Sequence, residues 1–193
     1  MTTQTITPQR SNTTLWILLA SFLIPAIAAY GYFFLGDRPT PHSNGELILP
    51  VVDVENLQLK DVLGNSLDRD TLTPKWRMLY FTDGSCDTLC IESLYNMRQI
   101  NIALGKNQDR VQHAIIHLET ADQKFAHLLE AEHKEAFRLS TEKQSIPASL
   151  HKDIRAIYLM DPNGNIMMRF PESLDPKLIL KDINKLLKIS RIG

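Results

Sequence analysis

Cys86 and Cys90 are the only two cysteines of this chain, and they stand four positions apart. A thiolate is both a nucleophile and a metal ligand, so a close pair in an otherwise cysteine-free chain indicates a local chemical site. Positions four apart on a helix lie about 6 Å from each other at their Cα atoms, which is within disulfide range. The pair can therefore close to a disulfide or open to bind one metal ion. A bridge over so short a loop removes little entropy from the unfolded chain, which argues against a purely stabilising role.

The segments around the pair predict where it lies in the fold. The apolar run WRMLYFT, residues 76–82, predicts a buried central strand that stops at Asp83-Gly84-Ser85. Apolar residues at helical spacing predict a helix from about Cys86 to Leu104. The pair is thus expected where a strand ends and a helix begins. The free N–H groups and partial positive charge of a helix start favour the thiolate form.

The order of the remaining segments predicts a thioredoxin-like α/β domain. A short hairpin is expected within Leu57–Leu72. After the first strand and helix, we expect strand 111–118, helix 122–134, strand 155–160, its hairpin partner 166–170 and a final helix 176–189. A βαβ unit followed by a ββα unit is typical of that fold.

The N-terminal part of the chain predicts a membrane anchor. Leu15–Leu35 carries no charged residue and has the length that spans a bilayer core. We therefore expect a short tail at 1–14, a transmembrane helix at 15–35, a linker at 36–50 and the thioredoxin-like domain at 51–193. A cleaved signal peptide is the alternative, and both interpretations export the rest of the chain. Arg10 favours a cytoplasmic N-terminus.

The charge of the chain argues against one class of partner. The net charge is -1 with both signs mixed, so no basic face is available for nucleic acid. The partners expected are the membrane and another protein.

Metal binding would need more donors than the two cysteines. Soft thiolates suit copper, and an imidazole would complete the site. His151, in a loop entering the third strand, is the candidate third ligand, because that loop faces the cysteine-bearing helix start in a thioredoxin-like fold. A loop histidine is otherwise simply solvated. We interpret the other domain histidines as strand or surface residues: His113, His117, His127 and His133.

Two motifs resemble the Sco/SenC family, the membrane-anchored thioredoxin-like copper chaperones for the CuA centre of cytochrome c oxidase. The first is the strand with Cys86 and Cys90 (RMLYFTDGSCDTLC), and the second is the segment IYLMDPNGNI. The resemblance covers roughly residues 57–188. In place of the usual proline after the first cysteine stands Asp87, and the position of the copper-ligand histidine falls on Asp153. The tail and linker look closest to small bacterial Sco-like proteins associated with oxidase assembly.

This resemblance implies a bacterial inner-membrane protein with one span and its domain in the periplasm. The first hypothesis is an assembly factor for a haem-copper (cytochrome c) oxidase, not itself an enzyme. It would deliver one copper ion through Cys86, Cys90 and His151, or reduce the CuA-site cysteines. Its partners would be the oxidase subunit carrying the CuA site or other assembly factors.

Two alternatives stay open. One is an enzyme, a general membrane-tethered thiol–disulfide oxidoreductase, with Cys86 as the attacking and Cys90 as the resolving thiol. Such enzymes place a cis-proline opposite the motif, and Ile146-Pro147 is the candidate here. The other alternative is a docking module with a structural disulfide.

Overall fold

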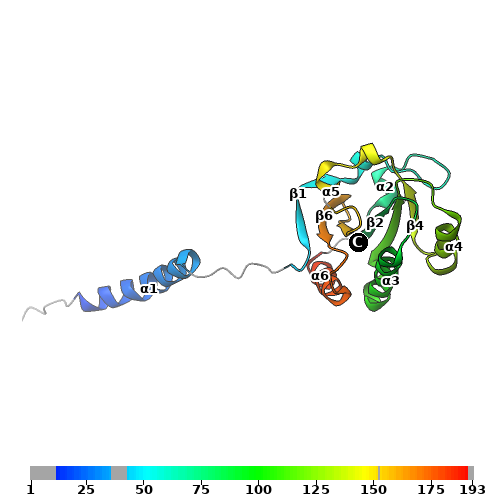
Figure 1. Cartoon of the computed structure of the whole chain (residues 1–193). Coiled ribbons are helices and arrows are strands. Elements are labelled where there is room, and N and C mark those ends of the chain that lie inside the picture. Colours follow the sequence, from blue (N-terminus) through cyan, green and yellow to red (C-terminus); the bar gives the residue numbers. More distant parts are fainter. Residues whose placement is uncertain (1–11, 36–42, 152, 191–193) are drawn as a thin grey trace, which may run out of the picture. The chain divides into compact units, whose positions relative to one another are not determined.

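A computed structural model describes residues 12–35, 43–151 and 153–190 of the chain. The chain divides into two compact units, Met1–His42 and Ser43–Gly193. In the first unit, helix α1 runs over Thr13–Leu35 (Figure 1). Its stretch Leu15–Phe34 is long and apolar enough to cross a membrane, and its large apolar side chains are exposed, as a helix that faces lipid requires. The predicted N-terminal helix is thus confirmed as a candidate membrane span.

The second unit is built on one six-stranded sheet in the order β1-β6-β5-β2-β3-β4. Strands β2, β3 and β4 are parallel to one another, whereas β5, β6 and β1 follow in antiparallel pairs. The strands are β1 (Glu46–Asp53), β2 (Trp76–Thr82), β3 (Val111–His117), β4 (Phe137–Ser140), β5 (Ile157–Met160) and β6 (Asn165–Phe170). The longer helices are α3 (Thr88–Ala103), α4 (Gln123–Glu132) and α6 (Pro176–Ile189). The short ones are η1 (Val54–Leu57), α2 (Arg69–Leu72), η2 (Gly105–Arg110), η3 (Lys143–Ser145) and α5 (Ala148–His151).

Two apolar clusters cover the two faces of the sheet. Helices α3, α4 and α6 contribute to one cluster, and η1, α2 and α5 contribute to the other. Strand β2 lies between them, with Met78 and Tyr80 in the first cluster and Leu79 and Phe81 in the second. All seven residues of β2 are buried, including Arg77 and Thr82, and the other five are apolar, as in a strand covered on both faces. The end of this rigid central strand is where the cysteine motif begins.

Most predicted elements are present, with two strands added. The strand at 76–82 and the helix at 176–189 have the expected bounds, and the cysteine-bearing helix starts two residues later than expected, at Thr88. The expected hairpin within 57–72 is reduced to a single bridge between Lys60 and Ser66. The added strands, β1 and β4, form the two edges of the sheet.

Strand β1 starts at Glu46, inside the segment 36–50 that the sequence assigns to a linker. The reason is a contact with α6 that is remote in sequence. The buried carboxylate of Asp182 accepts hydrogen bonds from the backbone N–H groups of Asn44 (2.7 Å) and Gly45 (3.0 Å) and from the Asn44 side chain (2.9 Å). These bonds hold the start of β1 against the body of the domain.

Candidate functional site

A disulfide joins Cys86 and Cys90, with a Cα–Cα distance of 5.2 Å. Cys86 comes two residues before the first residue of α3, and Cys90 lies in the first turn of that helix. The two sulfur-bearing residues differ in access, because Cys86 is partly exposed whereas Cys90 is only 3% exposed. An incoming reagent therefore meets Cys86 first.

The loop that carries Cys86 is held in place by hydrogen bonds from the last residue of β2 and from the N-cap residue of α4. The Thr82 hydroxyl donates to the Ser85 carbonyl (2.8 Å). The Asp122 N–H at the start of α4 donates to the Gly84 carbonyl (2.9 Å). Gly84 has a φ of +94°, and a Cβ atom there would lie 2.5 Å from the backbone oxygen of Thr120. Only glycine fits this close approach.

Asp87, the residue between the cysteines that replaces the proline usual in Sco proteins, is the N-cap of α3. Its carboxylate accepts a hydrogen bond from the Cys90 N–H (2.9 Å). This bond, followed by the contact with Arg155, holds the pKa of Asp87 below its usual value. A carboxylate therefore already uses a free N–H group of the helix start. Asp87 offsets part of the positive field of this helix start, and the expectation that the helix start favours a thiolate stays a prediction.

Arg155 links the helix start to the segment that follows β6. Its guanidinium donates to Asp87 (2.8 Å) and lies 3.7 Å from the carboxylate of Glu172. Glu172 also accepts from the Tyr80 hydroxyl (3.2 Å). Burial, reinforced by the Glu172 charge, raises the pKa of Tyr80, so this phenol stays protonated. Both carboxylates beside the cysteine pair are thus matched by one cation.

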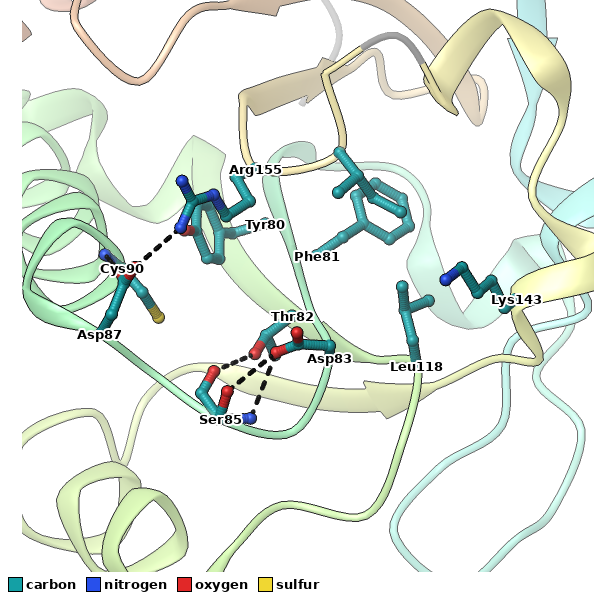
Figure 2. A pocket seen from close by; sticks show the side chains of 11 residues that line it. Tyr80, Phe81, Thr82, Asp83, Ser85, Asp87, Cys90, Leu118, Lys143 and Arg155 are labelled. Atoms are coloured by element: carbon teal, nitrogen blue, oxygen red, sulfur yellow. Dashed lines mark hydrogen bonds and ion pairs between the residues drawn. The ribbon is translucent and has the colours of Figure 1, made fainter.

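Tyr80, Asp87 and Arg155 line a cavity of about 220 Å³ at the carboxyl end of β2 (Figure 2). Cys90 contributes to its wall together with Tyr80, Asp87 and Arg155. Lys143 and Leu118 close the opposite end. In α/β folds, the carboxyl ends of strands are the usual place for chemistry. The location predicted from the sequence for the cysteine motif is the one observed.

His151 lies near this region but does not line the cavity. The segment predicted to face the helix start does so through Ile154 and Arg155. His151 is exposed at the end of α5, and its Nε2 atom lies 2.7 Å from the Ile146 carbonyl. Its role as a ligand remains a prediction. Among the residues with described positions, no group of three or more His, Cys, Asp or Glu side chains could hold a metal ion. Two sulfurs joined in a disulfide, with carboxylates nearby, do not by themselves fit a copper site.

Two other expectations need correction. His133 was expected at the surface, but it is 2% exposed, because the chain turns inward after α4. The peptide bond Ile146–Pro147 is trans, since the cis bonds within the described ranges are Leu49–Pro50 and Thr73–Pro74. His127 is exposed, as expected.

Sequence reasoning did not find Arg155, Glu172 or Tyr80. Arg155 had a usable signal, because it lies in the segment predicted to face the helix start. Glu172 had no usable signal in the sequence. It is 85 positions after Asp87, and only the order of the strands in the folded sheet brings the two residues close together.

Comparisons with known proteins agree with this architecture. A family model described as "transmembrane-like, thioredoxin-like, C-terminal domain" matches residues 76–190. Similar solved structures include copper-bound ScoI of Arabidopsis thaliana, with 18% identity and a TM-score of 0.57 over 68% of this chain and 96% of that chain. Copper-bound yeast Sco1 has 19% identity and a TM-score of 0.57 over 78% of this chain and 96% of that one.

Apo Sco1 from Thermus thermophilus has 15% identity and a TM-score of 0.57 over 77% of this chain and 99% of that one. No curated protein sequence matches the chain. At these identities the structural likeness establishes the fold. The predicted thioredoxin-like α/β fold is thus confirmed, and the Sco proteins that the motifs resemble are found among its structural neighbours.

Proposed function

Since this chain belongs to the family of transmembrane-like, thioredoxin-like C-terminal domains, we propose that it is a membrane-anchored thiol–disulfide exchange protein that serves oxidase assembly. The observation that carries the proposal is the difference in access between Cys86 and Cys90 within one short disulfide at the end of β2. An exposed attacking thiol and a buried resolving thiol are what stepwise exchange requires.

In the reducing direction, the Cys86 thiolate attacks one sulfur of a disulfide in the partner. The partner's S–S bond breaks, its other sulfur leaves as a thiolate that takes up a proton, and a mixed disulfide forms. The Cys90 thiolate then attacks the Cys86 sulfur and releases the second partner thiolate. Two electrons pass from this chain to the partner, and an external dithiol protein must supply two electrons to restore the pair.

The partner we propose is the subunit of a haem-copper (cytochrome c) oxidase that carries the CuA site, whose two cysteines must be reduced before copper can bind. Support comes from the resemblance of the Cys86–Cys90 motif to Sco/SenC proteins and from Sco structures among the structural neighbours. We place the domain in the periplasm of a bacterial inner membrane. A disulfide persists in such an oxidising compartment, and α1 supplies an apolar anchor.

Copper delivery is the second candidate. It is favoured by the soft sulfur donors that reduction of Cys86 and Cys90 would expose, and by the copper bound in two of the neighbouring structures. Copper would then be cargo, and His151 would have to leave the Ile146 carbonyl to serve as third ligand.

The test mixes the reduced full-length chain in detergent with an oxidised CuA-bearing subunit and follows the thiols of both proteins. We expect one disulfide to appear in this chain for each disulfide lost from the subunit, and none with Cys86→Ser/Cys90→Ser. Without transfer from the reduced wild type, the exchange proposal is wrong. Adding an excess of subunit and a dithiol reductant shows whether the chain turns over as an enzyme. A parallel copper titration, with His151→Ala beside the wild type, tests the second candidate.

A further inference from the structure

The two cysteines of the disulfide border different cavities. Cys90 borders the polar 220 Å³ cavity, and Cys86 is not part of its lining. Cys86 instead borders a groove of about 330 Å³ between α3 and α4, to whose lining Cys90 does not contribute. The disulfide therefore lies between the polar cavity, which Cys90 borders, and the groove between α3 and α4, which Cys86 borders.

The groove between α3 and α4 is apolar at its floor and mixed in charge at its rim. Ile91 on α3 and Phe125 and Leu128 on α4 supply the apolar surface. Ile91 is 38% exposed, although it is a large aliphatic residue beside a reactive site. The rim carries Asp122, Lys124, His127 and Glu132. Because the rim carries charges of both signs, apolar contact is the recognition that the groove offers.

The geometry of exchange determines from which side a partner must come. A thiolate attacks a disulfide sulfur along the S–S axis, from the side opposite the leaving sulfur. In the mixed disulfide, Cys90 is the attacking thiolate and the partner sulfur is the leaving one, so the partner sulfur lies on the side of Cys86 away from Cys90. The cavity that borders Cys86 without Cys90 is the α3/α4 groove. The polar cavity instead presents Cys90, the resolving cysteine, which is 3% exposed, with the Arg155–Asp87 ion pair on its wall.

We propose that the α3/α4 groove binds an apolar polypeptide segment of the partner protein that carries the reacting cysteine. The inference rests on the proposed exchange function and adds to it the surface and the kind of sequence that this surface recognises. Its occupant is set by continuity with the redox site, because a segment in the groove lies against Cys86, where the mixed disulfide must form. The polar cavity then serves Cys90, and no part of the partner enters it.

The test uses the reduced full-length chain with Cys90→Ser, in detergent, so that Cys86 is the one remaining thiol. Two peptides of equal length carry a central cysteine as a mixed disulfide with thionitrobenzoate, flanked by Leu and Phe in one and by Ser and Gly in the other. Release of thionitrobenzoate gives the rate, normalised to the reaction of each peptide with glutathione. We expect the apolar peptide to react about tenfold faster, as partial burial of one aliphatic side chain allows.

Variants of the groove wall provide the control. Ile91→Glu on α3 and Ala131→Glu on α4 should each abolish the preference for the apolar peptide. Ile102→Glu is the matched control, because Ile102 is also an exposed isoleucine of α3 (50%) but lies outside the groove. It should keep the preference. All variants should react equally with glutathione disulfide, which needs no groove.

The outcomes separate the groove from the exchange function. Equal rates for both peptides, or a preference that survives both groove variants, would overturn the groove while the exchange function stands. If Cys86 does not react even with glutathione disulfide, the exchange function is wrong and the groove proposal falls with it.

Discussion

Replacing Gly84 by alanine should cost far more stability than the same change at another glycine with positive φ. Gly84 has a φ of +94°, and an added Cβ would lie 2.5 Å from the backbone oxygen of Thr120 and 3.2 Å from that of Glu119. Gly64 has a φ of +85°, but nothing lies within 4 Å of its added Cβ. Alanine at either position must adopt a positive φ, but only alanine at position 84 also collides with neighbouring backbone atoms.

The magnitudes follow from these two contributions. A left-handed conformation costs a non-glycine residue about 1 kcal/mol, which is the whole effect expected for Gly64→Ala. At Gly84 the contact atoms are backbone, so the loop at Thr120 must move, and overpacking of this kind adds about 2 kcal/mol. We therefore expect Gly84→Ala to lower the free energy of unfolding by about 3 kcal/mol, or the Tm by roughly 9 °C, against roughly 3 °C for Gly64→Ala.

The assay is denaturation of the full chain in detergent, followed by the fluorescence of the buried Trp76. Because Gly84 lies two residues before Cys86, the displaced loop should also change the rate at which the reduced Cys86 is alkylated. Gly64→Ala should leave that rate unchanged. Equal losses of stability in the two variants would refute the claim that the approach of Thr120 restricts position 84 to glycine.

Three further predictions follow from the same site and its surroundings. In the reduced chain, iodoacetamide should modify Cys86 at least about tenfold faster than the buried Cys90, measured by mass spectrometry of the labelled peptides; equal rates would contradict the assigned roles. Asp87→Asn and Asp87→Ala should both speed alkylation of Cys86 by removing a negative charge, but only the alanine variant should lose helix content, because asparagine still caps α3. Burial lowers the pKa of His113 and His133, so both stay neutral in the folded domain. The unfolded chain takes up their protons as pH falls below about 6.5, and stability should then fall by up to about 1.4 kcal/mol per pH unit for each histidine, a slope that His113→Gln should reduce.

The sequence predicts those helices and strands whose pattern of apolar residues matches the faces that they bury. Strand β2 is apolar at five of its seven positions because both faces of it are covered, and α6 shows one apolar face because only that face meets the sheet. The short edge strand β4 could not be recognised, because its four residues carry no such pattern and it is defined by pairing with β3. Strand β1 was not predicted for the same reason, because it is defined by pairing with β6 and begins in a segment whose composition resembles a linker.

The cysteine pair was predictable, and its electrostatic surroundings were not. Spacing alone places Cys86 and Cys90 within disulfide reach, since both lie at one helix start. Arg155 precedes β5 and Glu172 follows β6. These residues reach the cysteine motif because β5 pairs with β2 and β6 pairs with β5. The sequence places His133 within the predicted helix 122–134, but α4 ends at Glu132, and a helical pattern does not show which way the chain turns beyond the end of a helix.

The replacement of proline by Asp87 has a consequence for the choice between copper delivery and thiol exchange. Asp87 places a carboxylate at the start of α3, and that carboxylate is held by the Cys90 N–H and by Arg155. Arg155 is a fixed cation on the wall of the cavity that Cys90 borders, which disfavours a metal ion on that side. Transfer of electrons between sulfurs needs no cation site, and Cys86 borders the α3/α4 groove and not this cavity. The charges around the disulfide are therefore compatible with thiol exchange as they stand, whereas copper binding would require both Arg155 and His151 to rearrange.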